Sequence, residues 1–260
     1  MLVDSHCHLD RLDFEALGQS LDETLAFARK QGVSHMLCVS IGMSTVEAVR
    51  RLAHLHTNVF ASVGSHPSEQ KGEEPGVARL VQLSDDPAVV AIGETGLDYH
   101  YCKGDLEWQR QRFRHHIRAA REIGKPLIVH SRDAEEDTLR ILREERAFEA
   151  GAVLHCFTGT MDMALQAVDM GLYVSFSGIV TFKNAGSLRA VARALPASAL
   201  LVETDAPYLT PVPLRGKPNQ PAHVRHVAEC VATCRNESLD TLADVTTNNF
   251  FTLFKHARRA

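Results

Sequence analysis

Short apolar runs recur along the chain, separated by longer segments in which apolar and polar residues mix at helical spacing. The runs are rich in Val, Ile, Leu and Ala, as in AVVAIGE and PLIVHS. Continuous apolar runs of this length are typical of strands that are covered on both faces. We expect strands over residues 2–6, 33–41, 58–64, 88–94, 126–131, 151–156, 171–176 and 198–204.

Helical patterns occupy the intervals, for example 105–124 and 133–148, and two more follow a Pro-rich loop at 206–221. Alternating strands and helices predict a parallel sheet covered by helices. Eight such units in 260 residues match the size of a (β/α)8 TIM barrel. A doubly wound open sheet is the alternative, but its glycine-rich fingerprint after the first strand is absent. We expect residues 1–260 to form a single domain.

Polar residues with metal-binding or acid–base chemistry stand where these strands end. They are His6, His8, His66, Glu94, His130, His155, Glu203 and Asp205. In a barrel, the carboxyl ends of all strands meet at one face, where active sites are built. The pattern therefore predicts that at least four histidines and two carboxylates gather at that face.

The stretch LVDSHCHLD at the start shows why a metal is expected. Strand side chains alternate, so His6 and His8 point to one face and Cys7 to the other. Two imidazoles from one strand can bind one ion, and imidazole with carboxylate suits zinc, manganese or iron-type ions. Glu94 and Asp205 close buried runs, where a carboxylate must be paired or bound to metal.

Glu203 is two residues before Asp205 and shares its face by the same alternation. It lies one layer deeper in the predicted strand. We expect Glu203 to support the metal ligands or to face the substrate rather than to bind the metal itself.

Charge and cysteine content narrow the class of protein. The formal net charge of −4 argues against a broad basic surface for nucleic acid, so any phosphate recognition must be local. The six cysteines have no disulfide-framework spacing, and no apolar run approaches about 18 residues. We expect a cytoplasmic monomer with no membrane contact. Local cations are available after the strands, namely Arg132, Lys183, Arg215 and Lys217.

Several long blocks resemble the signature blocks of TatD-type metal-dependent hydrolases, often called TatD DNases. They are DSHCHLD, GETGLDY, PLIVHSRDA, LHCFTGT, SFSGIVTFKNA and LLVETDAPYLTPVPLRGKPNQP, spread in the family's order from residue 3 to about 250. The resemblance implies an amidohydrolase-like (β/α)8 barrel with two metal ions. Members of that family are described as magnesium- or manganese-dependent DNases, some with 3′→5′ exonuclease activity on single strands.

The resemblance also implies roles for individual residues. It makes His6 and His8 ligands of one ion, His130 and His155 ligands of a second, and Glu94 the bridge between them. Asp205 matches a ligand that also handles the proton of the attacking water. We therefore expect two divalent ions (Zn, Mn or Mg) and catalytic roles for Asp205 and Glu94. His66, Arg132, Lys183, Arg215 and Lys217 are the expected substrate-binding residues.

Three functions compete at this point. The leading one is cleavage of phosphodiester bonds in DNA, as a 3′→5′ exonuclease on single-stranded ends. A small-molecule amidohydrolase or lactonase would use the same metal centre. A metal-stabilised binding module is less favoured, because structural metal sites close their coordination with protein ligands, whereas these acids and cations surround an open mouth.

Overall fold

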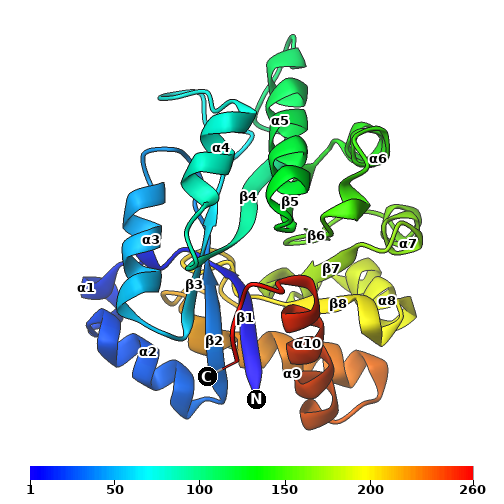
Figure 1. Ribbon diagram of the computed structural model, residues 1–260. Coiled ribbons are helices and arrows are strands. Elements are labelled where there is room, and N and C mark those ends of the chain that lie inside the picture. Colours follow the sequence, from blue (N-terminus) through cyan, green and yellow to red (C-terminus); the bar gives the residue numbers. More distant parts are fainter. Residues whose placement is uncertain (260) are drawn as a thin grey trace.

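The computed structural model describes residues 1–259, and eight parallel strands form its centre (Figure 1). Their order in the sheet follows the sequence from β1 to β8. The strands are β1 Leu2–Cys7, β2 Val33–Cys38, β3 Val59–Val63, β4 Val89–Asp98, β5 Leu127–Arg132, β6 Ala152–Leu154, β7 Tyr173–Phe176 and β8 Leu200–Val202. All eight expected strands are confirmed, and the sheet curls into a nearly closed TIM barrel.

Helices surround this sheet, as the parallel connections require (Figure 1). The helices are α1 Phe14–Leu17, α2 Leu21–Lys30, α3 Val46–Leu55, α4 Val77–Ser84, α5 Glu107–Ile123, α6 Glu135–Glu144, α7 Met161–Asp169, α8 Gly186–Ala194, α9 Val224–Arg235 and α10 Leu239–Leu253. None of those in residues 1–259 combines the length and apolar character needed to cross a membrane.

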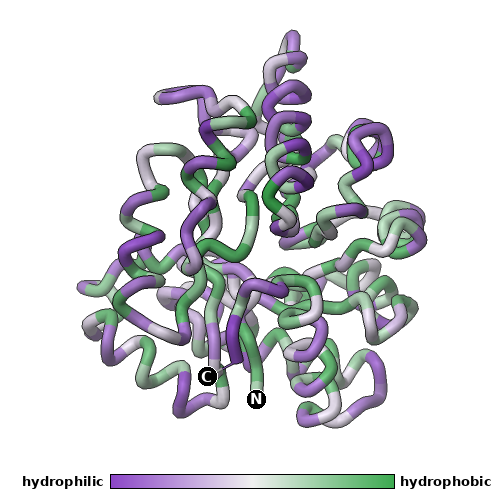
Figure 2. The backbone as a smooth tube through the Cα atoms, viewed as in Figure 1, coloured by the Kyte–Doolittle hydropathy of each residue, from purple (hydrophilic) through white to green (hydrophobic). Residues whose placement is uncertain are grey.

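The hydrophobic core has two parts. The larger lies mainly between the strands and the helices and includes Phe113 of α5. The smaller joins strand residues such as Leu37 and Ile128 to Phe250 of α10 and to Phe254, which directly follows that helix. Figure 2 shows the strands as mostly hydrophobic, while the helices alternate between hydrophilic and hydrophobic positions. The last helix thus covers one end of the barrel, which leaves the carboxyl ends of the strands as the open end.

Strand β4 runs four residues beyond its expected end, because glycines let it lie very close to its neighbours. A Cβ atom on Gly96, whose φ is +132°, would lie 2.0 Å from the carbonyl oxygen of His130. A Cβ on Gly93 would lie 2.7 Å from the carbonyl oxygen of Ile128. Only glycine fits at positions 93 and 96, so β4 approaches β5 closely and the two strands carry Glu94 and His130 into the same space.

A buried carboxylate joins the first strand to the segment after the last. Asp4 accepts hydrogen bonds from the backbone N–H of Thr204 at 2.8 Å and from its Oγ1 at 2.6 Å. The Thr204 hydroxyl also accepts from the Ala206 N–H. Burial raises the pKa of Asp4 to about 8, although the hydrogen bonds from Thr204 act to lower that pKa. The backbone N–H of Asp205 donates to the carbonyl of His6 at 2.9 Å, so this junction positions Asp205 beside β1.

Replacing Thr204 with Val tests that junction. Val keeps the shape but removes the hydroxyl, which leaves one Asp4 oxygen and the Ala206 N–H without their partner. We expect the free energy of unfolding to fall by about 1–3 kcal/mol, the cost of buried polar groups left unpaired. Urea unfolding of metal-free protein measures it. Thr204→Ser, which keeps the hydroxyl, is the control, and equal losses in the two variants would contradict a role for the hydroxyl.

Candidate metal centre

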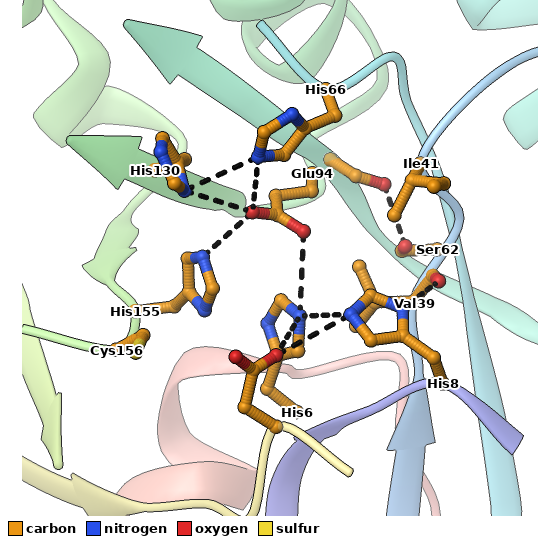
Figure 3. A network of polar contacts seen from close by, with 12 residues as sticks. His6, His8, Val39, Ile41, Ser62, His66, Glu94, His130, His155 and Cys156 are labelled. Carbon is orange, nitrogen blue, oxygen red and sulfur yellow. Dashed lines mark hydrogen bonds and ion pairs between the residues drawn. The ribbon is translucent and has the colours of Figure 1, made fainter. Parts of the chain in front are cut away.

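The polar side chains expected at the strand ends converge around Glu94 (Figure 3). Its Oε1 lies 2.7 Å from His155 Nε2, 3.2 Å from His130 Nδ1 and 3.3 Å from His66 Nε2. Its Oε2 faces the other way and lies 3.5 Å from His6 Nε2. One buried carboxylate therefore stands between histidines from four different segments of the chain.

His6 and His8 form the second part of the cluster, with Asp205. Their Nε2 atoms are 3.3 Å apart, and Asp205 Oδ1 lies 3.4 Å from His8 Nε2 and 3.7 Å from His6 Nε2. The pairing of β1 with β2 shifts register between Asp4 and Cys7. The thiol of Cys7 lies elsewhere, buried and donating to the Leu37 carbonyl.

Three of the histidines are oriented by an oxygen on the side away from the centre. His8 Nδ1 lies 2.9 Å from the Val39 carbonyl, His130 Nε2 lies 3.0 Å from Asp98 Oδ2, and His155 Nδ1 lies 3.3 Å from Glu203 Oε1. When the outer nitrogen donates to such an oxygen, the inner nitrogen presents a lone pair to the centre. This arrangement is the usual support of metal-binding imidazoles.

The electrostatics of the cluster favour an ionised acid among largely buried imidazoles. Burial acts to raise the pKa of Glu94, but the surrounding histidines, His155 first, hold that pKa well below its usual range. Burial, aided by the charge of His155, lowers the pKa of His6. Burial also opposes ionisation of Asp98, yet the hydrogen bond with His130 brings its pKa down to about 2.

The donor atoms fit a divalent ion. Three sets, two of which share His6, place one ligand atom from each member within 4.8 Å of the others: His6, His8 and Asp205; His66, Glu94 and His130; His6, His155 and Glu203. Imidazole nitrogen and carboxylate oxygen are ligands of zinc and manganese. His6 Nδ1 and Glu203 Oε2 are buried without a hydrogen-bond partner among residues 1–259, so the cluster is not a self-satisfied hydrogen-bond network.

Glu203 and His66 need separate comment. Glu203 is fully buried, accepts from the Cys156 N–H at 2.7 Å and lies 3.3 Å from His155 Nδ1, and its supporting role stays a prediction. His66 was expected to bind substrate. In the structure, His66 Nε2 lies 3.3 Å from Glu94 Oε1, nearly as close as His130 Nδ1 at 3.2 Å. A role for His66 in binding substrate stays a prediction.

A cavity of about 720 Å³ opens above the cluster. Of the expected substrate-binding residues, His66 and Arg132 line it. Lys183, Arg215 and Lys217 are not among its lining residues within 1–259, and the Arg215 guanidinium lies 3.9 Å over the Phe182 ring. Their role in binding substrate stays a prediction.

Three buried polar residues on one face of α5, which the sequence reasoning missed, hold the segments around the site. Gln109 Nε2 donates to the Pro67 carbonyl at 2.9 Å, and Gln109 Oε1 accepts from the Asp98 N–H. Arg112 donates from Nη1 to the carbonyls of His66 and Glu69.

The third member is His116, whose Nδ1 donates to the Arg112 carbonyl and whose Nε2 accepts from the Ser65 N–H at 3.0 Å. The spacing of three and four residues along α5 indicates that the three side chains share one face of the helix. It does not indicate their partners, which are mostly backbone atoms far away in the sequence. The α5 face therefore positions both the His66 loop and Asp98, the partner of His130.

Comparison with known proteins shows the family of this chain. A family model described as "TatD related DNase" matches residues 3–255. The chain belongs to the TatD family. The TatD-family chain is 50% identical over 253 residues to an uncharacterised metal-dependent hydrolase, YcfH, of Escherichia coli K12, covering 97% of this chain and 95% of that one.

Two further relatives of this TatD-family hydrolase are informative. One is the 3′-5′ ssDNA/RNA exonuclease TatD of Klebsiella pneumoniae, 36% identical, covering 90% of this chain and 91% of the other. The other is the crystal structure of YJJV, a TatD homologue of E. coli, with a TM-score of 0.89, 29% identity and 98% of each chain covered. The metal-dependent hydrolase family and its barrel are thus shown.

The α5 face generates a pH prediction. Burial, the largest cause, lowers the pKa of His116 from 6.5 to about 3, so below pH 6.5 the unfolded chain binds a proton that the folded chain excludes. Stability from this group is complete above pH 6.5 and is lost as the pH falls towards 3. Between pH 7 and pH 5 the loss is about 2 kcal/mol. We expect His116→Gln to remove that part of the pH dependence in urea unfolding of metal-free protein.

The neighbouring His115 on the same helix, whose Nδ1 has no hydrogen-bond partner within residues 1–259, supplies the matched control. His115→Gln should keep the pH dependence of the parent. If His116→Gln and the parent lose the same stability between pH 7 and pH 5, His116 is not held neutral by the fold.

Proposed function

We propose that this TatD-family hydrolase binds two divalent ions and cleaves phosphodiester bonds, acting 3′→5′ on single-stranded DNA ends. The observation that carries the proposal is the position of Glu94, whose two carboxylate oxygens face different groups of histidines. His6, His8 and Asp205 would hold one ion, His130 and His155 the other, and Glu94 would bridge them. Glu203 and Asp98 would support His155 and His130 from behind.

Two such ions, when bound, would lower the pKa of a water towards about 7 and polarise the oxygen of the substrate. Asp205 lines the cavity, so its carboxylate can receive the proton of the attacking water. It can then pass that proton to the oxygen that leaves when the phosphorus–oxygen bond breaks. Glu94 is enclosed by histidines on both sides and holds its position throughout.

Two observations favour a phosphodiester over other esters. Arg132 lines the cavity, and a guanidinium can bind a phosphate through two parallel hydrogen bonds. The K. pneumoniae relative is named as an exonuclease on single-stranded DNA and RNA.

A small-molecule amidase or lactonase is the second candidate. Ile41, Ile179 and Leu209 line the same cavity and would suit an apolar ring or acyl group. Assay of the metal-loaded protein on a 5′-labelled single strand and on a panel of lactones and amides separates the two. Cleavage of the strand without turnover of the panel supports the proposal, and the reverse result refutes it.

Metal content tests the bridge. We expect up to two divalent ions per chain, fewer than one in Glu94→Ala, and about one in His8→Ala, because His8 contacts one part of the cluster and Glu94 contacts both. Elemental analysis of purified protein with a folding check by circular dichroism measures this. Full occupancy in Glu94→Ala would rule out the bridging role.

Asp205→Asn tests the proton acceptor. The amide keeps the shape and one ligand oxygen but accepts a proton poorly, so kcat should fall by about 10²–10⁴-fold while KM changes much less. Metal occupancy is measured in the same preparation, because an amide oxygen is a weaker ligand. A metal-replete variant with kcat near the parent's would contradict the acid–base role. If neither the metal-replete parent nor the variant shows any turnover, a binding module is favoured instead.

A further inference from the structure

Two exposed tyrosines stand on opposite sides of the cavity. Tyr101 follows β4 and Tyr208 follows β8, with 67% and 48% of their surfaces exposed, and both line the cavity. In a ring of eight strands ordered by sequence, β4 and β8 stand four places apart, the largest separation available. An aromatic ring left exposed at the rim of a cavity offers a bound ligand a large apolar face, because burying that face against the ligand removes it from water.

Tyr101 forms one platform together with Arg132. The Arg132 guanidinium lies 4.6 Å from the centre of the Tyr101 ring. Asp98 fixes this platform, because its Oδ1 accepts from the Tyr101 N–H at 2.7 Å and its Oδ2 lies against His130. The same carboxylate thus ties the platform to one side of the metal centre. Arg132 is the one Arg or Lys among residues 1–259 that lines the cavity, so cationic recognition there rests on this pair.

Tyr208 forms the other platform, next to the opposite side of the centre. Its ring packs edge-on to His8, with the ring centres 5.9 Å apart. Its N–H donates to the Asp205 carbonyl at 2.9 Å, and its own carbonyl accepts from the buried Asn219. Both rings are therefore held on anchored backbone, which lowers the entropy lost when they bind a partner.

We propose that the Tyr101–Arg132 pair and Tyr208 each stack on an unpaired nucleobase, one on either side of the phosphodiester that is cleaved. This inference rests on the proposed nuclease function and gives that function its choice of substrate. Every base has an aromatic face, so such stacking ignores sequence and contributes about 1–3 kcal/mol per base. Bases inside a duplex are already stacked on both faces, so the two platforms would select single strands without the need for a broad basic surface.

The test is a thermodynamic cycle that combines tyrosine variants of the protein with DNA strands that lack single bases. Tyr101→Leu and Tyr208→Leu are assayed with metal-loaded protein on short 5′-labelled single strands, either intact or with one abasic site at the last or the next-to-last 3′ position. On intact strands each variant should raise KM by about 5- to 150-fold, the stacking range, with a smaller change in kcat. Tyr101→Phe and Tyr208→Phe, which keep the ring, should restore KM.

The abasic strands distinguish stacking from a general disturbance. Each Leu variant should lose most of its KM effect on the strand that lacks the base its tyrosine contacts, and the two tyrosines should respond to different positions. Phe148→Leu is the matched control, because Phe148 is 47% exposed but lies in the short helix Ala147–Glu149 ahead of β6, outside the cavity lining. Its KM should equal the parent's.

The outcomes separate the two proposals. Cleavage of single strands with unchanged KM in the Leu variants, or with KM raised equally on intact and abasic strands, overturns the stacking assignment and leaves the nuclease function standing. A metal-loaded parent that turns over lactones or amides but no single strand overturns both.

Discussion

The site depends on one buried carboxylate. Glu94 is 3% exposed, and such an acid is stable in ionised form only with compensating partners. Histidines from β1, from the loop after β3, from β5 and from the end of β6 supply them, so Glu94 stands between both halves of the cluster. Glycines on either side of it let β4 approach β5 closely enough for this geometry.

That arrangement survives only because backbone atoms around it are held by buried polar side chains. Asp4 ties β1 to Thr204 and so sets Asp205 beside His6 and His8. The Gln109, Arg112 and His116 face of α5 holds the loop that carries His66 and the N–H of Asp98. The segments that follow the strands, such as the His66 loop and residues 204–206, lie beyond the strand pairing, and these side-chain contacts hold their backbone in place.

The residues proposed for recognition and those proposed for chemistry lie in different parts of the mouth. The residues proposed to hold metal lie deep, on strands and their immediate ends, where the barrel is rigid. Tyr101, Arg132 and Tyr208 lie above them on the loops or at strand ends and are partly exposed. Because the net charge of the chain is −4, we expect attraction for a negatively charged substrate to be local and to come from Arg132 at the mouth of the cavity.

The sequence by itself determined the eight strands, their parallel order and the gathering of His6, His8, Glu94, His130, His155 and Asp205, because apolar runs set strands and a barrel brings their carboxyl ends together. It did not reveal that Asp98 holds His130, that Gln109, Arg112 and His116 hold the loop after β3, or that β4 continues to Asp98. Nor did it separate Arg132 from Lys183, Arg215 and Lys217 at the mouth. Only the tertiary structure decided these points, because each depends on contacts between side chains and backbone atoms far apart in the chain, which hydrophobic spacing does not encode.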